Sequence, residues 1–199
     1  KLIRTKGRGA REAAALLTKL EQRGGAALDA VLGDVRRIVS AVRKQGDRAL
    51  LRYAMRFDGL PGREALRVSR EEMAAAWEST PPALQQALRA AAEQIRGFAE
   101  KQMPQAWSDT EAAGLTRGQL VRPLASVGCY VPSGRHPLPS TLLMTAIPAH
   151  VAGVQRIVAV SPKPSKETLA AAILLSITEF YRIGSTHGMR LRINPPMSA

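Results

Sequence analysis

The chain has 199 residues, 45% of them hydrophobic, which is enough for the core of one medium domain or two small ones. This composition argues against disorder of the whole chain, and the lack of any apolar run of about 18 residues argues against a membrane-spanning helix. The net charge of +13 suits a nucleic-acid partner, but scattered arginines and an aromatic content of only 4% argue against one.

Residues 1–110 are predicted to form a helical N-terminal region. Apolar residues recur at three- and four-residue spacing between residues 28 and 42, which predicts one amphipathic helix. This stripe comprises Leu28, Val31, Leu32, Val35, Ile38, Val39 and Val42. Gly46 is expected to end this helix and Asp47 to cap the next one.

Two further helices are predicted before residue 105. Ser69 and Glu72 have the spacing of a capping box, which predicts a short helix through Trp77. The pair Pro81-Pro82 is expected to start a long helix that breaks near Pro104. The predicted core face of this long helix comprises Leu84, Leu88, Ala91, Ile95 and Phe98.

Residues 115–183 predict an α/β region, because short β-rich runs there are separated by proline, glycine and helical segments. Strands are expected at 118–122, 127–131, 156–161 and 180–183, with one helix opening at Ser140 and another over 166–176. Strands that alternate with helices predict parallel pairing. The predicted fold class is therefore α/β, a helical N-terminal region packed with a small parallel sheet of incomplete Rossmann-like β-α-β units. Residues 184–199 lack periodicity and are expected to form an irregular tail.

The loop over residues 132–139 is the candidate ligand site. Its prolines stiffen the chain at the carboxyl end of a strand, where ligands of open α/β sheets bind. Ser140 is expected to cap the following helix, whose first amides favour an anion. The Gly-x-Gly-x-x-Gly fingerprint is absent, so an ordinary Rossmann pyrophosphate turn is not predicted. Tyr130 at the strand's exit fits equally well against a nucleotide base or ribose and as a structural side chain.

The charge pattern around this loop also suits an anion. No carboxylate lies between Glu111 and Glu167, whereas six basic residues do. A segment depleted in carboxylates favours a ligand such as a pyrophosphate. A generally arginine-rich composition explains the total charge at least as well.

Two stretches around the loop resemble the histidinol dehydrogenase family. Val127-Gly-Cys-Tyr-Val-Pro-Ser-Gly134 matches the family's Val-Gly-x-Tyr-Val-Pro-Gly-Gly. Pro139-Ser-Thr-Leu-Leu-Met-Thr-Ala-Ile-Pro-Ala-His-Val-Ala-Gly-Val154 matches its Pro-Ser-x-x-Leu-Met-x-x-Ile-Pro-Ala-x-Val-Ala-Gly-Val. Segments 42–50 and 56–59 also look like the family's N-terminal helices, so the resemblance covers about residues 11–184.

The resemblance implies an NAD- and zinc-dependent oxidoreductase of histidine biosynthesis. The family converts a small-molecule substrate, L-histidinol, through L-histidinal to L-histidine with reduction of two NAD, and it forms homodimers. The resemblance also implies that Tyr130 contacts NAD, and that Pro132 and Gly134 of the same loop lie at the cofactor. In the family, zinc holds the substrate, a histidine acts as base and a glutamate activates water.

The chain also departs from the family pattern. Ser133 replaces the second residue of the Pro-Gly-Gly turn and must accept the φ that this turn needs. After Gly184 the family continues with Gly-Ala-Gln-Ala-Ile, and here His187 takes the place of the glutamine that touches NAD. The family's Gly-Pro-Gly-Asn loop, zinc ligands and Glu-His catalytic pair find no match. We therefore expect a homologue truncated after about residue 184, cytoplasmic, with a partial NAD site, no catalytic or metal-binding residues and no activity alone.

Neither the histidines nor the cysteine predict a further site. His136, His150 and His187 lack the short spacing of zinc ligand pairs. Cys129, the only cysteine, is expected to be a small apolar filler in a strand. Two other function classes stay open, a nucleotide- or anion-binding module without catalysis and, with less support, a basic nucleic-acid-binding protein. Apolar surface left uncovered is expected to promote self-association.

Overall fold

The computed structural model describes residues 6–21, 25–111, 113–134 and 136–184. The helices are α1 (Ala10–Glu21), α2 (Gly25–Gln45), α3 (Asp47–Tyr53), α4 (Arg70–Glu78), α5 (Pro82–Lys101), α6 (Pro139–Val151) and α7 (Lys166–Leu174). Shorter helical turns are η1 (Gly7–Gly9), η2 (Ala54–Asp58) and η3 (Arg63–Ala65). The strands are β1 (Arg67–Val68), β2 (Trp107–Thr110), β3 (Thr116–Gln119), β4 (Ser126–Tyr130), β5 (Arg156–Val160) and β6 (Glu179–Tyr181).

Four strands form the main sheet, in the order β1-β6-β5-β4. The pairs β4–β5 and β5–β6 are parallel, with Cys129 opposite Ala159 and Ala159 opposite Phe180, so α6 and α7 are the crossovers of two consecutive β-α-β units. At the other edge, β1 pairs antiparallel with β6. The predicted α/β class with a small, mostly parallel sheet is confirmed.

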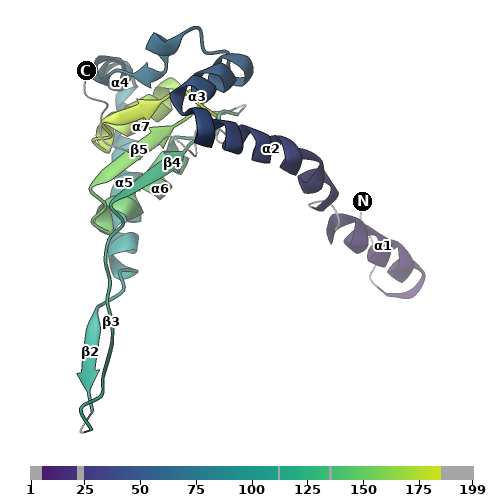
Figure 1. Ribbon diagram of the computed structural model, residues 1–199, viewed down its shortest axis with the longest axis vertical. Coiled ribbons are helices and arrows are strands. Elements are labelled where there is room, and N and C mark those ends of the chain that lie inside the picture. The colour runs from purple at the N-terminus through teal and green to yellow at the C-terminus, as the bar shows by residue number, and fades with distance from the viewer. Residues whose placement is uncertain (1–5, 22–24, 112, 135, 185–199) are drawn as a thin grey trace.

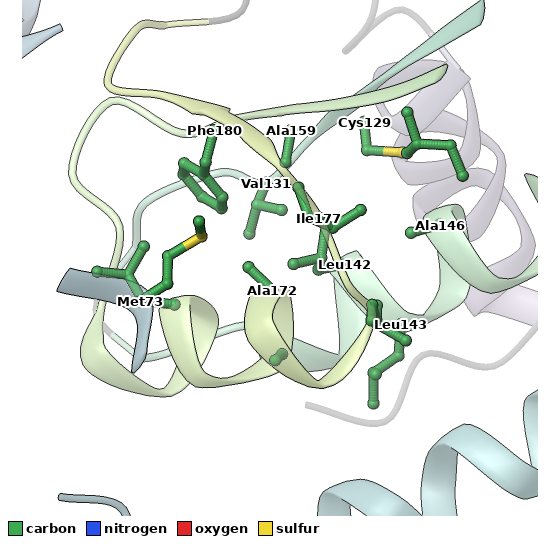
Figure 2. Close-up of a cluster of buried hydrophobic side chains, with 14 of the residues drawn as sticks. Met73, Cys129, Val131, Leu142, Leu143, Ala146, Ala159, Ala172, Ile177 and Phe180 are labelled. Carbon is green, nitrogen blue, oxygen red and sulfur yellow. The ribbon is translucent and has the colours of Figure 1, made fainter. Parts of the chain in front are cut away.

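The two faces of the sheet bury different helices because side chains alternate along each strand. On one face, Cys129, Val131 and Phe180 join side chains of α4, α5, α6 and α7 in what we call the first core (Figure 2). On the opposite face, Val158 and Val160 pack with α3 and the end of α2 in the second core. The sheet therefore lies between two helical layers.

Two segments extend away from this body (Figure 1). One is the arm formed by α1 and α2, in which Val42 is buried in the second core whereas Val31, farther out, is 51% exposed. The other is the antiparallel ribbon β2–β3, whose residues are all exposed. In the described part of the chain, no helix is both long and apolar enough to cross a bilayer.

The sequence predicted the positions of the helices more accurately than the residues that cap them. Ser69 does cap α4, accepting a hydrogen bond from the Glu72 amide at 3.1 Å. The predicted cap at Ser140 is wrong, because α6 begins one residue earlier at Pro139, whose fixed φ suits the first helical position. Asp47 is likewise the first residue of α3, and the cap is Gly46 with φ 58°.

The structure corrects two further predictions. The strand expected at 118–122 is β3, and it pairs with β2 in the separate ribbon, since the turn after β2 folds the chain directly back. Phe98 is 65% exposed although it was predicted to be core. The buried line along α5 runs from Leu88 through Ile95 to Ala99. Phe98 lies about 100° around the helix from Ala99, outside that line.

Candidate functional site

A cavity of about 110 Å³ lies at the carboxyl ends of β4 and β5. It is lined by Pro132, Ser133, Gly134, His136, Pro137, Leu138, Ser161, Lys163, Ser165 and Thr168. Both crossover helices pack on the same face of the sheet, so the two loops stay close together. The cavity is accordingly smaller than the roughly 300–1,000 Å³ of a site for a drug-sized ligand. It fits one part of a dinucleotide rather than the whole molecule.

Hydrogen bonds hold the two loops together at the cavity. The backbone amide of Lys163 donates to Ser133 Oγ at 3.2 Å, which joins the loop after β5 to the loop after β4. Below this contact, the Val131 amide donates to the Val160 carbonyl at 2.8 Å. Among the described residues, Ser176 is the only non-glycine with a positive φ, so Ser133 sits in ordinary backbone. The departure from the family's glycine at this position therefore costs no strain and adds a link between the loops.

The start of α7 gives the cavity a polar wall. Ser165 caps this helix, accepting from the Thr168 amide at 3.2 Å, and the two hydroxyl oxygens lie 3.1 Å apart. Amides in the first turn of a helix lack intrahelical acceptors and carry partial positive charge. Lys163 adds a full positive charge, and none of the lining residues is acidic. The wall therefore favours an anion.

The structure brings together only part of the predicted cofactor set. Pro132 and Gly134 line the cavity. Tyr130 does not line it, because strand alternation points its half-buried ring into the second core, away from Val131. His187 lies outside the described residues.

The residues on the far wall of the cavity were not predicted to line a site; they are Ser161, Lys163, Ser165 and Thr168. The sequence contains a pattern that predicts these residues, because residue 161 ends the strand predicted at 156–161, which is parallel to the strand at 127–131. Carboxyl ends of neighbouring parallel strands meet at one edge, so the loop after residue 161 had to lie beside the loop after residue 131. The Ser165-x-x-Thr168 spacing also marks a capped helix start.

The described residues do not fit a zinc site. In the part of the chain that the structure describes, no three His, Cys, Asp or Glu side chains gather. His150 Nε2 lies 3.1 Å from the Leu175 carbonyl oxygen, so this nitrogen carries the proton and donates to that oxygen. A nitrogen used in this way cannot bind a metal ion. His136 lines the cavity with no such partner set around it.

Cys129 is a core residue, as its place in a strand predicted. Its side chain is 3% exposed and lies in the first core (Figure 2). Burial raises the pKa of the Cys129 thiol, against a smaller lowering by a hydrogen bond with Thr145. Since the thiolate is the reactive form, the group is poorly suited to nucleophilic chemistry at neutral pH.

Comparisons with known proteins point in one direction. The profile of the family described as histidinol dehydrogenase matches residues 21–190. The chain is 44% identical to the histidinol dehydrogenase of Methanothermobacter thermautotrophicus over 87% of this chain and 42% of that protein. It is 41% identical to that of Syntrophotalea carbinolica, over 88% of this chain and 42% of that protein.

A solved structure agrees with the sequence matches. The crystal structure of histidinol dehydrogenase from Elizabethkingia anophelis superposes with a TM-score of 0.73 at 29% sequence identity. The alignment covers 80% of this chain and 38% of that one. The chain thus spans about two fifths of the length of the relatives it matches.

Proposed function

The chain belongs to the histidinol dehydrogenase family, a family of oxidoreductases, and on this premise we propose that it serves the NAD side of the oxidation of L-histidinol to L-histidine. The observation that carries this proposal is the cavity at the carboxyl ends of β4 and β5. Hydroxyl groups and Lys163 line it and no carboxylate does, which suits the phosphates of the cofactor. Membership of this enzyme family also disfavours the nucleic-acid alternative.

We assign the cofactor contacts to the rim of this cavity. When bound, NAD accepts the hydride that the substrate loses. Pro132 and Gly134 line the cavity and would contact the part of the cofactor that enters it. Since about 110 Å³ holds only one part of a dinucleotide, we assign the rest of the cofactor to the edge of the sheet at the end of β4. Tyr130 ends this strand, and although its half-buried ring packs against the second core, we assign its exposed part to the cofactor. His187 completes the proposed set.

Zinc binding and proton transfer are not assigned to this chain. Its described residues offer no cluster of ligands, and the Glu-His pair of the family has no counterpart among the residues that match. We propose instead that these groups belong to the part of the family's fold that the present chain does not match.

The purified 199-residue chain is expected to form no NADH from L-histidinol, with or without added zinc, because it supplies only the cofactor side of the reaction. The measurement is the absorbance of NADH at saturating L-histidinol and millimolar NAD. The Methanothermobacter thermautotrophicus relative, assayed in parallel, is the positive control. Zinc-dependent NADH formation by this chain would contradict the proposal that it supplies only the cofactor side of the reaction.

Self-association is also part of the proposal, as in the homodimers of the family. The α1–α2 arm carries large apolar side chains that are about half exposed, and such surface is typical of an interface. These side chains are Leu16, Leu17, Leu20 and Val31.

A further inference from the structure

Ser161 is a buried polar residue whose hydroxyl makes no hydrogen bond within the described fold. It follows β5 directly, is 1% exposed and lines the cavity. Its backbone amide donates to the Tyr181 carbonyl at 3.0 Å. Among the described residues, however, nothing pairs with its hydroxyl oxygen. Buried hydroxyls almost always have a partner, because leaving one unpaired costs free energy. The exception needs an explanation, and the cavity supplies one.

The direction of the Ser161 side chain follows from its strand. Ile157 and Ala159 point into the first core, so residue 161 points to the same face, toward the start of α7. There Thr168, 2% exposed, and the helix cap Ser165 form the opposite wall. A group in the cavity would therefore meet hydroxyls from two elements.

The positive charges around Ser161 favour an anionic ligand. Lys163, two residues on, lines the same cavity, and the first-turn amides of α7 carry partial positive charge. Glu167 stands in that turn but does not line the cavity. The cavity volume of about 110 Å³ is well below the roughly 300–1,000 Å³ of a site for a drug-sized ligand. This size suits a phosphate group, which has five heavy atoms.

We propose that Ser161, Lys163 and the start of α7 form an oxyanion subsite that holds a phosphate group of the dinucleotide. Ser161 Oγ donates one hydrogen bond to a phosphate oxygen, and the Lys163 ammonium neutralises its charge. The assignment of this phosphate to NAD rests on the proposed function. The oxyanion subsite itself rests on the unpaired hydroxyl and the cavity.

Calorimetric titration of the full chain with inorganic pyrophosphate tests the subsite. Ser161→Ala and Lys163→Ala are each expected to weaken binding about tenfold, since each removes one hydrogen bond or ion pair to a charged group. Lys101→Ala is the matched control, because it removes the same charge from an exposed position at the end of α5 that does not line the cavity. This control is expected to stay within about twofold of the parent chain.

Thermal unfolding without pyrophosphate separates binding from folding. Ser161→Ala is expected to leave the melting temperature unchanged or raise it, because it removes an unpaired buried hydroxyl. Undetectable pyrophosphate binding by the parent chain, or variants of Ser161 and Lys163 that bind no more weakly than Lys101→Ala, would overturn the subsite.

Competition with NAD distinguishes the two levels of the proposal. If NAD displaces pyrophosphate and shows the same dependence on Ser161, both the subsite and the proposed function are supported. If pyrophosphate binds in a Ser161-dependent manner but NAD does not compete, the subsite stands and the proposed function fails. If NAD binds without any effect of Ser161→Ala, the proposed function stands and the subsite fails.

Discussion

Replacing Phe180 with alanine is expected to lower the free energy of unfolding by about 3–5 kcal/mol. Phe180 is the central residue of β6 and is 0% exposed. Its ring packs in the first core, with Met73 of α4 nearby and Ile177 before the strand (Figure 2). Truncation of the ring leaves a cavity in the first core, and the surrounding side chains relax into it only partly. Because small domains are stable by only about 5–15 kcal/mol, this one change removes a large share of the total.

Phe98→Ala is the matched control for this prediction. It deletes the same side chain from a position that is 65% exposed. The expected change in the free energy of unfolding is within about 0.5 kcal/mol, as for other surface substitutions. Urea unfolding followed by circular dichroism measures both variants. Equal losses for Phe180→Ala and Phe98→Ala would contradict the assignment of the buried face.

Replacing Glu179 with glutamine is expected to cost about 1.5–3 kcal/mol at neutral pH. Glu179 begins β6 and accepts two hydrogen bonds from Arg156 of β5, with Nε–Oε1 and Nη2–Oε2 distances of 2.6 Å each. Both residues are half-buried, with side-chain exposures of 30% for Arg156 and 21% for Glu179. Glutamine keeps the shape of the side chain but removes its charge and replaces one acceptor oxygen with an amide nitrogen, so the two charge-assisted hydrogen bonds to Arg156 are not both kept.

The same pair predicts how stability depends on pH. The hydrogen bond from Arg156 is the main cause that holds the pKa of Glu179 below its ordinary value. A carboxyl whose pKa is lower in the folded state adds stability above its unfolded pKa of about 4.3, and this stability is lost as the pH falls through the folded pKa. The gap between the parent chain and Glu179→Gln should therefore be largest near pH 7 and shrink under acid conditions.

Urea unfolding of both proteins at neutral and acidic pH checks this dependence. Glu78→Gln, at an exposed position of α4, is the control and should change the free energy of unfolding by less than about 0.5 kcal/mol at either pH. A Glu179→Gln gap that stays constant, or grows, as the pH falls would refute the role given to the Arg156 pair.

The β-α-β units were predictable from local sequence because their signals are local. Apolar runs bounded by proline and glycine gave the β4 and β5 strands, and the crossover between them follows from parallel pairing. The strand β1 is only two residues long, and it exists because Arg67 and Val68 lie beside β6 in the folded chain. No pattern in two residues predicts such a pairing.

Only the part of the cavity formed by the loop after β4 was predictable from the sequence. Pro132 and Gly134 follow a recognisable strand, and both line the cavity. Tyr130 ends the same strand, but one step along a strand reverses the face, so its ring packs against the second core and not on the cavity wall, and its contact with NAD stays a prediction. The unpaired hydroxyl of Ser161 depends on tertiary burial, which periodicity does not report.

An amide nuclear magnetic resonance titration of the chain with NAD tests most directly whether the crevice after β4 and β5 holds the cofactor. Saturable shifts are expected at millimolar NAD or below, concentrated in the loop after β4 and in residues 161–168, because these segments surround the cavity. L-histidinol without NAD should leave these amides unchanged. No shifts at millimolar NAD, or shifts centred on the α1–α2 arm or the β2–β3 ribbon, would contradict the claim that this crevice holds the cofactor.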